Sequence, residues 1–247
     1  MHNEMNVAVL FLPQAREVQE IIHYLDKQDI TATILTLKDK EDITSFDAFI
    51  IPSFHEEAFN KIQNEETKTF LDKIRFEETK GKPVIALGNA AKLILENNFI
   101  PETHGYSIQK TDVETPLKVT MINTATRQTP FTYHIEEDAT IKGEIKTPHA
   151  SLRIENTGLE EKEQASIINN LFINDQVLFC YCNDEGDIEE TKQTNPLQSI
   201  ENIAAVTNRK GNVLAIFPEL TINHENQDNQ ILNSIKTHIL EEKKFSE

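Results

Sequence analysis

Predicted strands and helices alternate through the first hundred residues, and this alternation restricts the fold more than any other feature of the sequence. Four nearly continuous apolar runs have the character of strands buried on both faces: residues 6–12, 31–37, 48–51 and 84–87. Three segments carry apolar residues at helical spacing: 16–28, 57–80 and 89–97. Alternation of this kind predicts a doubly wound α/β fold with a mostly parallel sheet and flanking helices. Ligands bind such sheets at the carboxyl ends of the strands.

The second half of the chain has shorter apolar segments with alternating polarity, which are typical of antiparallel strands. The expected strands are residues 117–122, 131–135, 141–148, 176–182, 203–207 and 213–217. Residues 155–165 and 183–195 are acidic and polar, and we interpret them as surface loops or the start of a helix. A closing helix is predicted at 229–242. With no internal repeat or linker, the sequence predicts a single domain over residues 6–242 with a smaller antiparallel sheet beside the parallel one.

Net charge narrows the range of partners. The chain carries 41 acidic and 24 basic residues, a formal charge of −17, which is the wrong sign for binding a phosphate backbone or an anionic membrane. We therefore expect no nucleic-acid partner. No segment approaches the ~20 apolar residues of a membrane span, and the first residues do not resemble a secretory leader, so a cytoplasmic protein is expected.

The two cysteines lie in one predicted strand. Cys180 and Cys182 are two positions apart, so they point to the same face, where a mutual disulfide has poor geometry. No further cysteine or histidine stands near them at metal-ligand spacing. We interpret both as reduced structural thiols and expect neither a metal site nor a cofactor.

Two segments of the chain carry a family resemblance: residues 81–90 (GKPVIALGNA) and residues 199–218 (SIENIAAVTNRKGNVLAIFP). They resemble the class I glutamine amidotransferases, and among these most the glutaminase subunit of phosphoribosylformylglycinamidine synthase in purine biosynthesis. The similarity extends from residue 7 to about residue 240. The resemblance implies a flavodoxin-like fold, glutamine hydrolysis without a cofactor, and a synthetase large subunit of the purine pathway as partner. In that chemistry a cysteine thiolate attacks the amide, a histidine acts as base, a glutamate orients it, and backbone N–H groups bind the oxyanion.

The catalytic residues that the resemblance implies are absent. Gly88 stands at the cysteine position, and no Cys, Ser or Thr occurs between residues 80 and 102. An alignment without gaps places Glu219 at the histidine and Thr221 at the glutamate. A two-residue deletion instead aligns residues 217–219 with the family's His-Pro-Glu, which keeps the glutamate but again loses the histidine. Either alignment removes the nucleophile and the base.

Glycine is scarce, at 7 of 247 residues, or roughly 3% against a usual ~7%. Part of this scarcity falls on loops where the family uses glycine to bring backbone N–H groups close to glutamine, as at Ser53. The candidate ligand or vestigial pocket comprises Pro52, Ser53, His55, Gly88, Asn89, His149 and Glu219. For His55 the alternative is an exposed loop residue, and for His149 a structural hydrogen bond.

Three functions remain open at this point. The chain is predicted to be a non-catalytic glutaminase-like protein that is a structural or regulatory partner of a synthetase subunit. The first alternative is a divergent but functional subunit of phosphoribosylformylglycinamidine synthase. The second is a module that binds a small metabolite in the vacated pocket.

Overall fold

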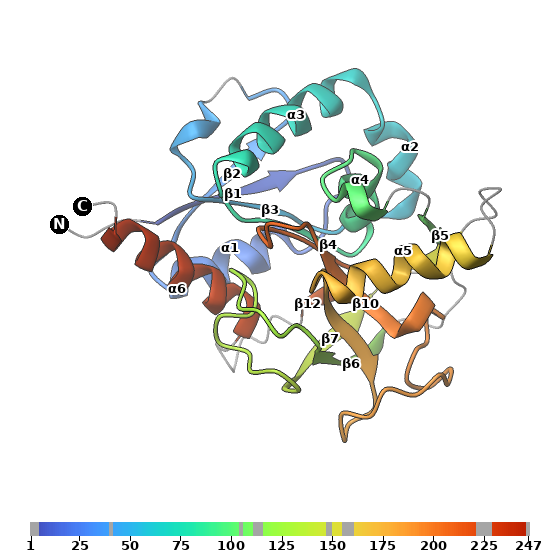
Figure 1. The fold of residues 1–247 in the computed structure, drawn as a ribbon. Helices are drawn as coiled ribbons and strands as arrows, with labels where there is room; N and C mark the ends of the chain where they lie inside the picture. The colour runs from blue at the N-terminus through green and yellow to red at the C-terminus, as the bar shows by residue number, and fades with distance from the viewer. Residues whose placement is uncertain are drawn as a thin grey trace.

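A ten-stranded mixed sheet organises the computed structural model, which describes residues 5–39, 42–103, 106–110, 116–146, 150–154, 161–220 and 229–245 (Figure 1). The strand order is β12-β7-β6-β9-β10-β11-β4-β3-β1-β2. A separate pair, β5-β8, forms a two-stranded sheet. The predicted α/β fold with flanking helices is confirmed.

The parallel part of the sheet comes mainly from the first hundred residues. Its strands are β1 (Asn6–Phe11), β2 (Thr31–Thr36), β3 (Ala48–Ile51), β4 (Val84–Leu87) and β11 (Val213–Ile216). All residues of β3, β4 and β11 are buried, as expected for central strands covered on both faces. Strand β11 enters this part from the far end of the chain and pairs with β4 over its whole length, from Val213 opposite Val84 to Ile216 opposite Leu87.

The antiparallel part comes from the second half of the chain. Its strands are β6 (Leu117–Asn123), β7 (Thr140–Ile145), β9 (Val177–Cys182), β10 (Ile203–Thr207) and β12 (Glu219–Leu220). These strands continue the parallel sheet. The separate two-stranded sheet consists of β5 (Tyr106–Lys110) and β8 (Ala150–Ile154), which the sequence patterns did not predict.

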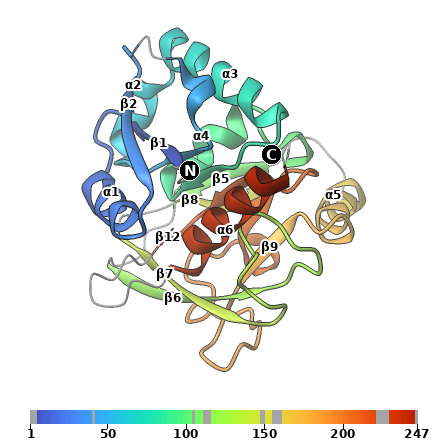
Figure 2. The same cartoon turned by 90° about the vertical axis from the view of Figure 1, so that its left-hand side faces the viewer.

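Helices cover both faces of the sheet. In Figure 1, α2 (Phe59–Ile62) and α3 (Glu65–Thr79) lie above the parallel strands, whereas α1 (Val18–Lys27) and α6 (Gln230–Phe245) lie below them. Figure 2, turned by 90°, shows the same arrangement. Helix α4 (Asn89–Glu96) follows β4, and helix α5 (Glu161–Ile173) precedes β9 in the antiparallel half of the chain. Among the described residues, no helix has the length and apolar character needed to cross a lipid bilayer.

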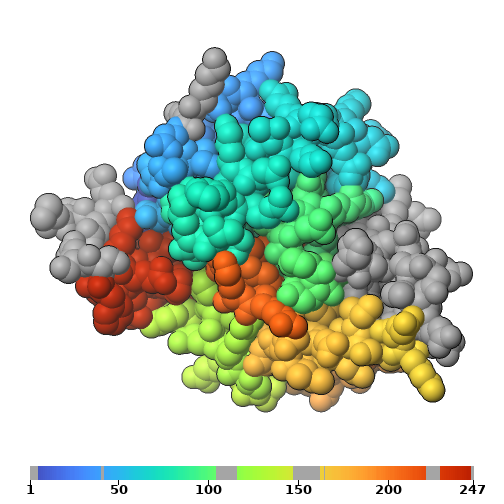
Figure 3. Space-filling view, turned by 45° about the horizontal axis from the view of Figure 1, so that its top comes forward, coloured from blue at the N-terminus to red at the C-terminus, as the bar shows by residue number. Residues whose placement is uncertain are grey.

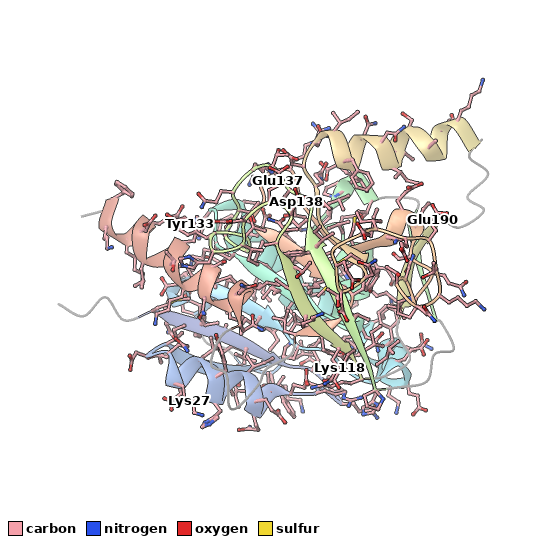
Figure 4. All side chains as sticks on the ribbon, turned by 90° about the horizontal axis from the view of Figure 1, so that it is seen from below. Lys27, Lys118, Tyr133, Glu137, Asp138 and Glu190 are labelled. Carbon is pink, nitrogen blue, oxygen red and sulfur yellow. The ribbon has the colours of Figure 1, made fainter. Side chains whose placement is uncertain are left out.

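Two predicted elements differ from the structure. The long helix at 57–80 is interrupted, because Asn64 caps a new helix by accepting a hydrogen bond from the Thr67 N–H at 2.9 Å. The strand predicted at 131–135 is a series of turns, on the looped connection where Figure 4 labels Tyr133, Glu137 and Asp138.

Threonine side chains explain why residues 131–135 do not form a strand. The Thr129 hydroxyl accepts from the Phe131 N–H at 3.2 Å, and the Thr132 hydroxyl accepts from the Thr129 N–H at 3.0 Å. Local bonds of this kind compete with a strand ladder. Phe131 and Ile135 are nevertheless buried, so the apolar pattern correctly predicted core residues but not their backbone.

Candidate functional site

The turn between β4 and α4 has the shape of a nucleophile elbow. Gly88 joins the two elements with φ 55° and ψ −126°, and its N–H donates to the Ile216 carbonyl of β11 at 2.9 Å. This region of backbone space is sparsely populated for residues that carry a Cβ, whereas glycine adopts it without strain. A sharp strand-to-helix turn of this kind displays one residue at the carboxyl edge of the sheet. In this chain, the displayed residue has no side chain.

Ser53 and Asn89 meet directly beside this turn. The Ser53 hydroxyl accepts a hydrogen bond from the Asn89 N–H at 3.3 Å, and the Asn89 side chain donates to the Phe54 carbonyl at 2.9 Å. Both residues are buried, with exposed fractions of 1% for Ser53 and 3% for Asn89. Pro52 is buried next to them, whereas His55 is exposed. The structure therefore groups Gly88, Asn89, Ser53 and Pro52 and leaves His55 at the surface.

Backbone hydrogen bonds join the loop after β1 to the loop after β3. The Arg16 N–H donates to the Ser53 carbonyl at 2.7 Å, and the His55 N–H donates to the Gln14 carbonyl at 3.3 Å. Between them, Ala15 and Phe54 form an antiparallel bridge. The two loops that frame a ligand site in this class of sheet are thus bonded to each other.

Glu219 lies in the segment after β11 and is fully buried. One carboxylate oxygen, Oε2, accepts from the Lys146 backbone N–H at 3.2 Å. The segment packs tightly against Gly143 of β7. A Cβ added at Gly143 would lie 3.1 Å from the Pro218 Cβ and 3.3 Å from the Glu219 carbonyl oxygen, so there is no room for a side chain between them. Thr221 and His149 lie outside the described residues.

Lys146 connects the two halves of the molecule near these groups. Its ammonium contacts the Glu17 carboxylate at the start of α1 and lies 3.6 Å from the Glu144 carboxylate. Burial lowers the pKa of Lys146; the Glu219 carboxylate opposes this shift and the Arg16 guanidinium adds to it. Sequence reasoning missed Lys146 and Glu17. The one signal was position, since Glu17 follows the loop after the first strand and Lys146 is three residues before the candidate pocket residue His149.

The chain has no thiol near the elbow. Both cysteines are free and buried in β9, which β10 and β11 separate from β4. Burial raises the pKa of Cys180 to about 12 and that of Cys182 to about 11, so neither is a thiolate at neutral pH. Across the described parts of the chain, no three His, Cys, Asp or Glu side chains are grouped to hold a metal ion. The site offers hydrogen-bonding groups and an ion pair.

Comparisons with known proteins agree with this architecture. Residues 60–245 match the CobB/CobQ-like glutamine amidotransferase domain family. The phosphoribosylformylglycinamidine synthase subunit PurQ of Methanosarcina mazei is 25% identical over 217 residues, which cover 87% of each chain. PurQ of Chlorobium chlorochromatii is 29% identical over 168 residues, 67% of this chain and 63% of that protein.

Solved structures show the same fold. A chain in the structure of PurLQS from Thermotoga maritima superimposes with a TM-score of 0.66 at 20% identity, covering 96% of this chain and 99% of that one. A glutamine amidotransferase from Thermotoga maritima gives a TM-score of 0.54 at 7% identity, covering 98% of this chain and 86% of that one. The resemblance found in the sequence is confirmed at the level of the family.

Proposed function

Because the chain belongs to the CobB/CobQ-like glutamine amidotransferase domain family, we propose that it is a non-catalytic member of it. In this proposal the chain has the fold of a glutaminase and serves as a structural or regulatory partner of a synthetase. It binds that partner without releasing ammonia from glutamine.

The observation that carries the proposal is the elbow with glycine at its tip. Gly88 has the backbone angles of a displayed nucleophile, φ 55° and ψ −126°, and no group that attacks a carbon. Removal of a nucleophile costs a hydrolase about 10⁶-fold in rate. The segment after β11, where the family carries its histidine, reads Phe217-Pro218-Glu219, so a base is missing as well. Binding groups alone do not replace both functions.

The relatives support the choice of partner. Several curated proteins similar to this chain are named as a subunit of phosphoribosylformylglycinamidine synthase, and a similar solved chain belongs to a structure titled PurLQS. We therefore take the proposed partner to be the synthetase large subunit of the purine pathway. Both signs of charge occur on the surface, but the net charge of −17 favours a partner with a basic face.

One experiment tests both parts. The full chain is co-expressed with the synthetase large subunit of the same organism, captured by a tag on either protein, and assayed for glutamate release from glutamine. We expect the two proteins to co-purify and the captured complex to release no glutamate above the rate of the isolated large subunit. Gly88→Cys is the matched variant, and it should remain inactive because no base is restored. Glutamine hydrolysis at an enzymatic rate by the unmodified chain contradicts the proposal and favours a divergent but functional subunit.

A further inference from the structure

The first N–H group of helix α4 has a partner in the loop that follows β3. N–H groups in the first turn of a helix have no acceptor within the helix, so they need one from elsewhere. The Asn89 N–H finds it in the Ser53 hydroxyl at 3.3 Å, at a buried position after β3. The hydrogen bond links residues 36 positions apart in sequence, so it depends on the packing of β3 against β4.

This N–H has a defined role in elbows that carry a nucleophile. The backbone N–H of the residue after the nucleophile is one of the donors that stabilise the oxyanion. With Gly88 at the nucleophile position, that donor is the Asn89 N–H. The Ser53 oxygen therefore lies within hydrogen-bond distance of the group that a substrate carbonyl oxygen would need.

Ser53 is held in place from both directions. Its carbonyl accepts from the Arg16 N–H at 2.7 Å, and the carbonyl of the next residue, Phe54, accepts from the Asn89 side chain at 2.9 Å. A ligand that reached the Asn89 N–H would have to displace a side chain that is 1% exposed and break its hydrogen bond. The ligand's carbonyl oxygen would replace Ser53 as acceptor for the Asn89 N–H, but the displaced, buried Ser53 side chain would have to find new room and a new partner.

We propose that Ser53 is an internal plug: its hydroxyl occupies the oxyanion position of the vacated site and excludes the carbonyl group of an amide ligand. This inference rests on the proposed function, since it takes Gly88 to stand at the nucleophile position. It adds that the site is closed to glutamine as well as lacking the groups to cleave it.

The first test is amide hydrogen exchange of the full chain, measured at Asn89 by NMR. We expect slow exchange in the unmodified protein and at least tenfold faster exchange at Asn89 in Ser53→Ala, with the rest of α4 unchanged. Ser45→Ala, which removes an exposed hydroxyl from the 3-10 turn Ile43–Ser45 before β3, is the control and should leave Asn89 unchanged. Equal exchange at Asn89 in Ser53→Ala and in the unmodified protein overturns the plug.

The second test installs a thiol as a reporter. Gly88→Cys and the double variant Gly88→Cys/Ser53→Gly are treated with a chloroketone analogue of glutamine, and thiol loss is followed over time. The single variant should react slowly, without saturation by the reagent, whereas the double variant should react at least tenfold faster. The unmodified protein supplies the background, because its two thiols are buried.

Two results in this second test overturn the plug. One is a single variant that already reacts fast and saturably, and the other is a double variant that reacts no faster than the single one. The exchange experiment keeps Gly88, so it decides the question even where the strained cysteine variants do not fold. Neither readout depends on the synthetase partner or on glutamine turnover, so failure of the plug is distinguishable from failure of the proposed function.

Discussion

The parallel strands β4 and β11 have a polar cluster at each end, and the two clusters differ in what they do. At the amino end lies the turn of residues 208–212, which leads into β11 and packs on the end of α3; we call it the Asn208 turn. In Figure 3 the orange atoms around it lie directly beside the turquoise atoms of α3. At the carboxyl end lies the elbow, Gly88 with Asn89 and Ser53. The Asn208 turn lies in the segment 199–218 that resembles the family, and Gly88 and Asn89 lie in the segment 81–90.

At the Asn208 turn, the side chains that match the family pattern hold the fold together. The Asn208 Oδ1 accepts from three backbone N–H groups, those of Gly211 at 2.9 Å, Asn212 at 3.1 Å and Val213 at 3.2 Å. Its Nδ2 donates to the Glu78 carboxylate and to Asn212 Oδ1, both at 3.0 Å. At the elbow, the backbone shape is kept and the reactive groups are absent. The Asn208 turn therefore resembles the family through side chains with a structural role, and the elbow resembles it through its backbone.

The largest expected effect comes from Asn208→Ala. The substitution removes the side-chain acceptor of the buried Asn212 and Val213 N–H groups and one donor to the Glu78 carboxylate, whereas the Gly211 N–H still has the Asn208 carbonyl at 2.9 Å. Each unsatisfied group costs about 1–3 kcal/mol, so we expect a loss of about 3 kcal/mol in the free energy of unfolding. Urea denaturation measures it. Asn60→Ala, which removes an exposed amide from α2, is the control and should change stability little. A loss at Asn208 no larger than the control would break the comparison.

Gly88→Ala tests whether the elbow keeps its strained shape. A Cβ at φ 55° and ψ −126° is disfavoured, and such positions cost about 1–3 kcal/mol, so we expect about 2 kcal/mol of destabilisation by urea denaturation. Because alanine brings no reactive group, the loss measures the backbone alone. An unchanged unfolding midpoint would show that the turn relaxes freely around a Cβ and does not require glycine at position 88.

Much of the fold was predictable because its strands are local patterns. The bounds expected for β3 and β4 match the structure, since each is a run of four buried apolar residues. Residues 131–135 carry a similar apolar pattern, yet the Thr129 and Thr132 hydroxyls hold them in turns. Position 88 could be placed between a strand and a helix from sequence. The contact of Lys146 with Glu17 could not, because 129 positions separate them and only the folded sheet joins them.

A third variant, Gly143→Ala, asks how tightly the segment after β11 is held. The new Cβ would lie 2.8 Å from the Met121 methyl, which can move, and 3.1 Å from the Pro218 Cβ, which is fixed by its ring. Overpacking of this kind costs about 1 kcal/mol or somewhat more. Thermal unfolding detects it, with the exposed Thr140→Ala on the same strand as control. A stabilised Gly143→Ala protein would mean that this segment is loosely packed and that the elbow region has more freedom than the Asn208 turn.

The smallest expected effect is a pH dependence of the free energy of unfolding. It arises from Glu77, the neighbour of the Glu78 that Asn208 contacts. Glu77, at the end of α3, contacts Lys80 at 2.6 Å and Lys82 at 2.7 Å. Burial alone would raise the pKa of Glu77, but the hydrogen bonds from the two lysines outweigh it and hold the pKa below its ordinary value of 4.5. A carboxyl whose pKa is lowered by folding stabilises the protein above its unfolded pKa, and this contribution is lost as the pH falls through the folded pKa.

Stability of the unmodified protein should therefore decline as the pH falls below about 4.5, and Glu77→Gln should lack this component. Urea denaturation at pH 7, 5 and 3.5 measures the difference between the two proteins, which we expect to be largest at pH 7 and to shrink toward pH 3.5. Asn60→Ala, with no change of charge, should follow the unmodified protein at each pH. A stability difference between the two proteins that grows as the pH falls would contradict this prediction. It would show that Lys80 and Lys82 do not stabilise the charged Glu77 carboxylate.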